Sequence, residues 1–439
     1  MSASAIDTIV APATPIGRSA LAIVRIDGPL SASILKSLSG AAPEPRYVAL
    51  VELAHDSQHI DHCLAVRYEA PYSFTGNDLV ELTLHGSSVI VGEVIRAAIA
   101  LGARFAEPGE FTERAVLNGK LDLVQAESIA DLINARTSLQ ASLSLANLEG
   151  SLSRKASAVR ESLLHVISRL EAALDFSEEG YEFISSGDAR AMIERAVADS
   201  SALLETYRRG RASRSGLDAV ILGRPNAGKS TLLNRLVGSD RAIVTPIPGT
   251  TRDIVRETIE IGGLPVTIAD TAGLRESGDV VESIGVERAR RAAEAGDLIL
   301  YLVDASAGLT DEDHKELARW PEAWVVYTKT DIKPVAADAI GISVVTEHGV
   351  DELLSRLDQF VRERFAAPEG SLVNERQYQA VAECVDALRA AIASIDAGHD
   401  EQIILVDLYR ASTALGLLTG AITRDEVFDE IFSKFCIGK

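Results

Sequence analysis

Apolar residues recur along this chain at two spacings, and each spacing predicts a different kind of element. From residue 120 to residue 207 they return every three or four positions, which places them on one face of a helix. The clearest series is Val159, Leu163, Val166, Leu170 and Leu174. Residues 374–395 and 402–418 repeat this spacing. Because an apolar stripe needs a partner to cover it, we expect the two helical segments to form one bundle.

Short uninterrupted apolar runs lie between these helical segments and predict buried strands. They cover residues 217–222, 265–269 and 324–327, and residues 342–344 end a further short strand. Residues 231–237, which follow the first run, read as the start of a helix. Strands without polar alternation are typical of a parallel sheet that is covered on both faces. We therefore expect an α/β domain inserted into a helical domain.

The N-terminal part has a third character. Residues 1–118 mix short β-like runs with turns that contain proline and glycine, as is typical of an α+β domain. Breaks in composition at residues 210–216 and 366–371 read as linkers. We expect a multidomain α/β protein with segments 1–118, 119–214, 215–370 and 371–439, the second and fourth being two parts of one helical domain.

A phosphate-binding motif follows the first predicted strand. Residues 223–230 read G-x-x-x-x-G-K-S, ahead of the predicted helix. A glycine-rich turn in this position brings backbone N–H groups and the positive end of a helix dipole to a phosphate chain. Lys229 adds a charge at the β- and γ-phosphates, and Ser230 adds a hydroxyl for Mg²⁺. Further motifs downstream argue against a chance glycine-rich turn.

Asp-Thr-Ala-Gly at residues 270–273 follows the second predicted strand. There the Asp270 carboxylate can hold Mg²⁺ through water, and the Gly273 N–H can reach the γ-phosphate. Residues 248–253 lie between these two motifs and supply hydroxyls for Mg²⁺ and the γ-phosphate. Both motifs stand at strand ends, as ligand-binding residues do at the carboxyl edge of a parallel sheet.

A guanine-binding motif follows the third predicted strand. Thr-Lys-Thr-Asp occupies residues 328–331, and the Asp331 carboxylate can accept the two N–H donors of the guanine edge. Ser343, after the next short strand, can support the base from the other side. Together the four motifs predict a Ras-like P-loop GTPase domain that binds and hydrolyses GTP.

The residues around the motifs restrict how hydrolysis proceeds. Leu274 stands where Ras-like GTPases carry the glutamine that orients the attacking water, and a leucine cannot do this. Asn226, with backbone carbonyls of residues 245–250, can coordinate a monovalent cation that neutralises developing charge. Alternatively, Asn226 is a turn residue with an unusual backbone angle. The carboxylate that orients water is one of Glu276, Asp279 and Glu282.

Composition bears on the compartment. Cys63, Cys384 and Cys436 form no paired framework, which suits a reducing cytosol. The N-terminus lacks a signal pattern and no apolar run reaches transmembrane length, so we expect a cytoplasmic protein with no membrane contact. His55, His59 and His62 raise the question of a metal site. Since residues 56–58 read as a turn between strands and the cluster has no partner cysteines, we favour an ordinary hairpin.

Motifs outside the nucleotide-binding segment are more specific, and with them the chain resembles the tRNA-modification GTPase family called MnmE or TrmE over essentially all 439 residues. They are Pro-Tyr-Ser-Phe-Thr-Gly (71–76), Val-Glu-Leu (80–82), residues 108–115 and 117–122, Gly-Thr-Thr-Arg-Asp (249–253), Val-Glu-Ser-Ile-Gly (281–285) and the terminal Phe-Cys-Ile-Gly-Lys (435–439). One departure is Thr328 in place of the usual asparagine, which is expected to weaken a contact with the phosphate loop.

The resemblance implies a reaction and its partners. With a flavin-dependent MnmG (GidA) partner, such proteins add a carboxymethylaminomethyl or aminomethyl group to C5 of the wobble uridine, U34, of certain tRNAs. The carbon comes from a tetrahydrofolate derivative, in its 5-formyl or 5,10-methylene form, bound to the N-terminal domain. That α+β domain is also expected to form a homodimer.

The resemblance also implies site residues. Folate contacts fall on Arg25, Glu81, Lys120 and Lys439; Mg²⁺ on Ser230 and Thr251; and K⁺ on Asn226, Thr245, Ile247 and Thr250. Glu282 becomes the preferred catalytic carboxylate, acting through water, with Arg252 and Cys436 as further catalytic candidates. The GTP-binding set is Asn226, Ala227, Gly228, Lys229, Ser230, Thr231, Thr245, Pro246, Ile247, Pro248, Gly249, Thr250, Thr251, Asp270, Thr271, Ala272, Gly273, Thr328, Lys329, Asp331 and Ser343.

Three points stay open at this stage. Cys436 is either a nucleophile toward the uracil ring or an ordinary thiol in the tail. A net charge of −21 fits tRNA binding poorly, so we expect the partner to supply most of the affinity, with Arg208, Arg209, Arg211 and Arg214 as the basic stretch. Alternative functions are a cation-dependent GTPase switch and a non-catalytic scaffold.

Overall fold

Residues 7–176, 183–238, 241–243, 256–270, 291, 293–294, 296–422, 428 and 431–439 are described by a computed structural model of the chain. Their contacts divide the chain into two units. The first unit comprises Met1–Ala130 and Thr413–Lys439, and the second comprises Asp131–Ser412. Among the described residues, no helix has both the length and the apolar character that a membrane crossing needs.

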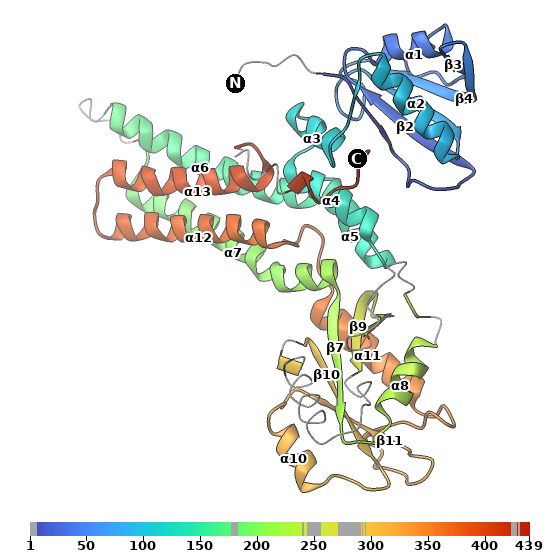
Figure 1. The fold of residues 1–439 in the computed structure, drawn as a ribbon. Coiled ribbons are helices and arrows are strands. Elements are labelled where there is room, and N and C mark those ends of the chain that lie inside the picture. The colour runs from blue at the N-terminus through green and yellow to red at the C-terminus, as the bar shows by residue number, and fades with distance from the viewer. Residues whose placement is uncertain are drawn as a thin grey trace. The chain divides into compact units, whose positions relative to one another are not determined.

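A six-stranded sheet in the order β3-β4-β5-β2-β1-β6 forms the centre of the first unit (Figure 1). Its strands are β1 (Ile9–Pro12), β2 (Leu21–Asp27), β3 (Ala49–His55), β4 (Gln58–Tyr68), β5 (Leu79–His85) and β6 (Arg104–Phe105). All neighbours pair antiparallel except β1 and β6, which run parallel. This mixed sheet with its helices confirms the predicted α+β character of the N-terminal part.

The two faces of this sheet differ. Helices α1 (Ser31–Ser39) and α2 (Ser88–Ala100) cover one face, where their apolar residues share a core with Val24, Ile26 and Leu82. Because side chains alternate along a strand, Arg25 and Glu81 point to the opposite face. That face carries a smaller core around Phe111 of α3 (Glu110–Leu117).

The C-terminal residues belong to the first unit. Gly109, just before α3, has φ of 74°, and a Cβ there would lie 2.8 Å from the Phe432 carbonyl oxygen. Gly438 has φ of 90°, and a Cβ there would lie 1.9 Å from the Pro12 carbonyl oxygen. Both contacts need glycine, so the tail is closely packed against the N-terminal strands and α3.

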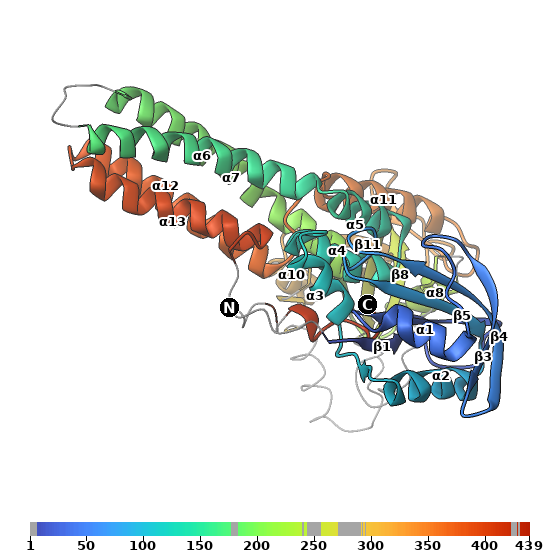
Figure 2. The same ribbon diagram turned by 90° about the horizontal axis from the view of Figure 1, so that it is seen from above.

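Four long helices lie side by side, and the last of them continues from the second unit into the first (Figures 1 and 2). They are α6 (Ser151–Asp175), α7 (Ser186–Ser215), α12 (Glu375–Asp396) and α13 (Glu401–Thr419); the shorter α4 (Leu123–Asn134) and α5 (Ser138–Leu148) precede them. Val159, Leu163, Val166 and Leu170 are buried in α6, as their spacing predicts. Helices from both sides of the α/β segment thus pack together, which confirms the predicted bundle.

The linker expected at residues 210–216 is wrong, because α7 continues to Ser215. Gly210 is buried, and a Cβ there would lie 1.9 Å from the Leu372 carbonyl oxygen, so glycine serves close packing here. The Ser213 hydroxyl lies 3.3 Å from the Phe365 carbonyl oxygen and accepts from the Ala367 N–H at 3.2 Å. The end of α7 is therefore held against the chain that leaves the α/β segment.

The inserted α/β segment contains a second sheet, in the order β12-β11-β10-β7-β9-β8. Its strands are β7 (Leu217–Gly223), β8 (Arg256–Ile261), β9 (Leu264–Asp270), β10 (Leu298–Asp304), β11 (Trp324–Thr328) and β12 (Ile340–Gly341). Only β8 pairs antiparallel. Described helices beside it are α8 (Lys229–Val237), α10 (Asp311–Leu317) and α11 (Val350–Phe365). Cores on both faces confirm the inserted P-loop α/β fold.

Candidate functional site

The phosphate-loop motif forms the turn between β7 and α8. Gly223 ends the strand with φ of 138°, and a Cβ there would lie 2.4 Å from the Leu302 carbonyl oxygen. Gly228 precedes the helix with φ of 89°. Asn226 also adopts a positive φ, 64°, as expected for a turn residue. The turn leads the chain directly into the N-terminus of α8, where backbone N–H groups attract anions.

Lys229 is the first residue of α8 and folds back over the turn. Its ammonium donates to the Gly223 carbonyl oxygen at 2.7 Å and to the Arg224 carbonyl oxygen at 2.9 Å. These bonds hold the positive charge at the turn itself. The neighbouring Ser230 and Thr231 are exposed at the same helix end. The glycine-rich turn, the helix N-terminus, Lys229 and Ser230 therefore come together at one place.

Thr328 connects the guanine motif to the phosphate loop. Its hydroxyl donates to the Ala227 carbonyl oxygen at 2.8 Å, and it also lies 3.3 Å from the Val303 carbonyl oxygen. The residue is 3% exposed, so these bonds are shielded from water. Threonine in place of asparagine therefore still joins the two loops, through a hydroxyl instead of an amide.

Lys329 has φ of 57° and forms an ion pair with Asp304 at the end of β10, with 2.5 Å between Nζ and Oδ2. This hydrogen bond, with those from Ser306, lowers the pKa of Asp304 to about 2. The Thr330 N–H donates to the Ile342 carbonyl oxygen at 3.2 Å. These contacts fix the backbone on either side of Thr330, and Asp331 follows as an exposed side chain.

The strand ends bring these motifs to one edge of the sheet. Gly223 pairs with Leu302, Asp304 with Thr328, and Tyr327 with Gly341, in parallel register. The expected strand at 342–344 is shorter and earlier, since β12 ends at Gly341. Ser343 follows it, fully buried, with its N–H bonded to the His348 carbonyl oxygen at 2.9 Å.

Several predicted positions cannot be placed. Asp270 ends β9 opposite Ile221, and nothing is described of its side chain. The following lie outside the described residues: Thr245, Pro246, Ile247, Pro248, Gly249, Thr250, Thr251, Arg252, Thr271, Ala272, Gly273, Leu274, Glu276, Asp279 and Glu282. Their predicted roles toward Mg²⁺, K⁺ and the attacking water therefore stay predictions.

A second cluster of charged residues lies in the first unit, on the sheet face opposite α1 and α2. Arg25 of β2 and Glu81 of β5 pair across the strands, with 2.7 Å between Nε and Oε1. The Arg25 guanidinium lies 5.3 Å from the centre of the Phe74 ring, within cation–π range. Burial, and then the charge of Arg25, lower the pKa of Lys439. An ion pair beside an aromatic ring thus lies within electrostatic range of the Lys439 ammonium.

The other predicted residues of this region lie close to the same loop. Lys120 donates from Nζ to the Pro71 carbonyl oxygen at 3.0 Å, at the start of the loop that carries Phe74. Cys436 is exposed, and the Lys439 N–H donates to its carbonyl oxygen at 3.3 Å. The four predicted folate contacts and Cys436 all belong to this one unit.

Buried ionic contacts that the sequence did not indicate support this loop. Asp27, which is fully buried, accepts from Arg114 of α3 at 2.9 Å and from the Asn77 side chain at 3.0 Å. It also accepts from the Thr75 hydroxyl. Phe74 was the other residue missed, although it lies inside a quoted motif. The signal available in the sequence was an aromatic residue, Phe74, between the turn-forming residues Ser73 and Thr75.

Comparisons with known proteins match almost the whole chain. A family model described as the MnmE helical domain matches residues 123–436, and one described as the GTP-binding protein TrmE N-terminus matches residues 8–120. The tRNA modification GTPase MnmE of Symbiobacterium thermophilum is 41% identical over 455 residues, spanning 99% of both chains. That of Koribacter versatilis is 39% identical over 450 residues, again spanning 99% of each.

Among solved structures, Aquifex aeolicus Era bound to GDP and aluminium fluoride is 27% identical over 39% of this chain and 66% of that chain, with a TM-score of 0.27. The family assignment rests on the two family models and on the relatives that match the chain from end to end. This chain belongs to the MnmE (TrmE) family of tRNA modification GTPases.

Proposed function

We propose that this protein hydrolyses GTP in a K⁺-dependent reaction and, with a flavin-dependent MnmG-family partner, modifies C5 of the wobble uridine of certain tRNAs. The added group is carboxymethylaminomethyl or aminomethyl, and its first carbon comes from a tetrahydrofolate derivative. One observation carries the proposal. A chain that aligns end to end with tRNA modification GTPases contains both a P-loop edge with a guanine motif and the Arg25–Glu81–Lys439 cluster.

The nucleotide chemistry follows from the P-loop edge. The N–H groups at the start of α8 and the Lys229 ammonium stabilise the charge of the phosphates, and Asp331 selects guanine. Thr328 keeps the base loop and the phosphate loop at a fixed separation. In this proposal Ser230 and Thr251 would hold Mg²⁺, which would neutralise phosphate charge. Asn226, Thr245, Ile247 and Thr250 hold K⁺, Glu282 orients water, and Arg252 acts beside them.

The cluster in the first unit suits a folate. Arg25 and Lys439 provide cations for carboxylate groups of a polyanionic tail, and Glu81 can accept N–H donors from a pterin ring. The chemistry of this donor set therefore fits the ligand. Lys120 adds a third cation at the loop that carries Phe74. Cys436 belongs to the same unit, and it is a candidate nucleophile toward C6 of the uracil ring.

Surface features support the proposed partners. The sheet face that carries Arg25 also exposes Leu50 and Leu64, which oppose each other across β3 and β4 and are 73% and 45% exposed. Uncovered apolar side chains of this kind favour a homodimer through the N-terminal domain. In the basic stretch, Arg214 is paired with Asp131 and Arg209 donates to the Glu363 carbonyl oxygen. Because these two arginines already make contacts within the chain, we propose that the partner supplies most of the affinity for tRNA. The reaction would take place in the cytoplasm.

The direct test is mass spectrometry of tRNA nucleosides from cells with and without this gene. The C5-substituted wobble uridine should disappear without the gene and return with the wild-type chain. It should not return with Arg25→Ala or Lys229→Ala. Lys36→Ala and Lys315→Ala remove exposed charges from the same two units and should restore it fully.

The outcome separates the alternatives. An unchanged nucleoside profile in the deletion strain, together with GTP hydrolysis by the purified chain, favours a GTPase switch without RNA chemistry. Full modification by a Glu282→Ala variant, with slow hydrolysis that K⁺ does not accelerate, favours a scaffold. Faster hydrolysis in K⁺ than in Na⁺, abolished by Asn226→Ala, supports the proposed cation site.

A further inference from the structure

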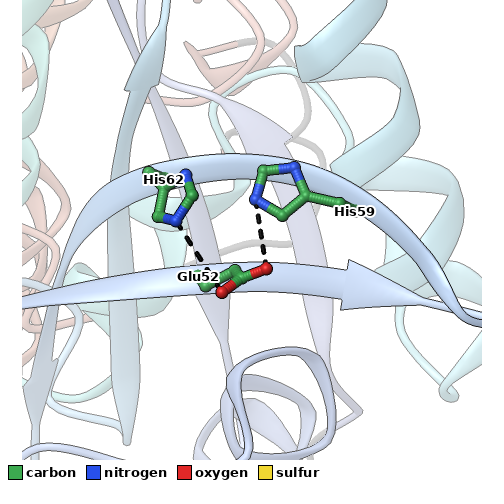
Figure 3. Close-up of side chains that lie close together, drawn as sticks. All are labelled: Glu52, His59 and His62. Carbon is green, nitrogen blue, oxygen red and sulfur yellow. Dashed lines mark ion pairs between the residues drawn. The ribbon is translucent and has the colours of Figure 1, made fainter.

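Two histidines and a glutamate converge on the uncovered face of the β3–β4 hairpin (Figure 3). His59 Nε2 lies 3.4 Å from Glu52 Oε1, and His62 Nε2 lies 3.7 Å from Glu52 Oε2. The two imidazole rings have their centres 4.6 Å apart. One ligand atom from each residue can be chosen so that all three lie within 4.8 Å of one another. All three side chains are exposed to solvent.

A β-bulge creates this arrangement. Residues three apart on a regular strand point to opposite faces, so His59 and His62 would separate. Here Glu52 of β3 pairs with His62, and Leu53 pairs with Asp61. The next residue of β3, Ala54, pairs with His59, so Ile60 of β4 is skipped. The extra residue in β4 turns His59 to the face of His62, while Asp61 stays buried on the other face. Bulges of this kind re-aim side chains, often at functional sites.

Two of the ligand separations approach those within the coordination sphere of a metal ion. Zinc binds imidazole nitrogen and carboxylate oxygen at about 2.0–2.2 Å, so two ligands of a tetrahedral ion lie about 3.4 Å apart. The two Glu52–histidine separations are already close to that value. Two histidines with one carboxylate form a donor set that suits zinc and other late first-row metals.

We propose that Glu52, His59 and His62 bind a divalent transition-metal ion, with zinc as the preferred ion and water at its remaining positions. The site is separate from the Mg²⁺ and K⁺ positions of the proposed GTPase reaction, which use residues of the other unit. The competing interpretation is a pair of exposed histidine–glutamate contacts, which would contribute little by themselves.

His55 provides a matched control on the same hairpin. Its Nε2 lies 3.6 Å from Asp56, next to the two-residue turn in which Asp56 and Ser57 have φ of 50° and 64°. It is not one of the three converging side chains. A substitution of His55 therefore removes one imidazole from the hairpin and leaves the proposed ligands in place.

The experiment is calorimetric titration of ZnCl₂ into the full-length chain without a histidine tag, stripped with EDTA and kept in excess Mg²⁺. All proteins carry Cys436→Ser, so that the exposed thiol does not compete. We expect one zinc ion per chain, loss of that binding in His59→Ala and His62→Ala, and affinity reduced by about tenfold or more in Glu52→Gln. His55→Ala should bind as the parent does.

A second measurement protects the test against misfolded variants. In the parent chain, zinc should slow the modification of His59 and His62 by diethyl pyrocarbonate, as read by peptide mass spectrometry, and leave the rate at His55 unchanged. Equal zinc binding in the parent, His59→Ala and His62→Ala, or equal protection of all three histidines, would overturn the proposal. So would a parent chain that takes up no zinc.

Discussion

A single hydroxyl joins the two loops that must hold one nucleotide. Thr328 is buried between the base loop and the phosphate loop, and its Oγ1 donates to the Ala227 carbonyl oxygen. Thr330, two residues further on, is a useful contrast, because its Oγ1 is buried without a hydrogen-bond partner among the described residues. Of these two threonines, only Thr328 connects the base loop to the phosphate loop through its hydroxyl.

Thr328→Val removes this hydroxyl at nearly constant volume and leaves the Ala227 carbonyl oxygen without its donor. We expect the affinity for GDP to fall by about tenfold, or about 1.4 kcal/mol. Thr328→Ser should keep most of the affinity, and Thr330→Val should change it little. Fluorescence titration with a labelled guanine nucleotide measures all three. A Thr330→Val variant weaker than Thr328→Val would show that the hydroxyl contact is not what matters.

The three cysteines should differ sharply in reactivity. Burial, and then the charge of Asp61, raise the pKa of Cys63 to about 12, and burial raises the pKa of Cys384 to about 11. Both thiols therefore stay protonated and covered at about pH 8, while Cys436 is exposed. We expect iodoacetamide to label Cys436 alone in the folded chain and all three in denaturant, as read by peptide mass spectrometry. Rapid labelling of Cys384 in the folded chain would contradict the packing of α7 against α12.

At the scale of elements, close helix packing decides where glycine is needed. Gly210 and Gly187 both lie in α7, but only Gly210 faces another backbone at short range. The nearest atom to a Cβ at Gly187 is a serine hydroxyl at 3.8 Å, an ordinary contact. The two positions therefore separate the effect of packing from that of helix propensity.

Gly210→Ala should lower the stability of the bundle by about 1–3 kcal/mol, because the methyl group forces α7 away from the Leu372 backbone. Gly187→Ala should be neutral or stabilising by up to about 1 kcal/mol, since alanine is the better helix former. Thermal unfolding followed by far-ultraviolet circular dichroism compares them. Equal midpoints for the two variants would mean that α7 adjusts without cost.

The sequence indicated most elements and the P-loop edge, and it failed where contacts between distant residues decide. The buried runs at β7, β9 and β11 were found because strands covered on both faces need apolar residues throughout. The glycine and serine of residues 210–216 suggested a linker, since their need for close packing with Leu372 is not visible locally. Glu52 was missed as a neighbour of His59 because a bulge, not spacing, puts them on one face.

At the scale of the whole molecule, the positions of the two tryptophans simplify measurement. Trp320 and Trp324 are the only tryptophans of the chain, and Trp324 belongs to β11 of the P-loop sheet. Tryptophan fluorescence therefore reports on the inserted segment and is silent for the first unit. The nucleotide binds that same segment.

Saturating GDP should raise the unfolding midpoint that tryptophan fluorescence reports. At a GDP concentration of about one hundred times Kd, the free energy of unfolding should rise by about 2.7 kcal/mol. The hydrogen exchange of β2 and β5 in the first unit should not change in the same experiment. Lys229→Ala should abolish the shift. Equal protection of β2 by GDP would show that nucleotide binding is coupled to the first unit even without the partner protein.

Ser213 has a consequence for how such a chain was assembled. Its hydroxyl contacts both Phe365 and Ala367, so the polypeptide leaves the α/β segment beside the place where it came in. A segment whose two ends meet can be added to a host, or cut out of it, without stretching either part. The helical bundle is thus continuous across the point of insertion, and one serine holds both junctions of the nucleotide-binding segment.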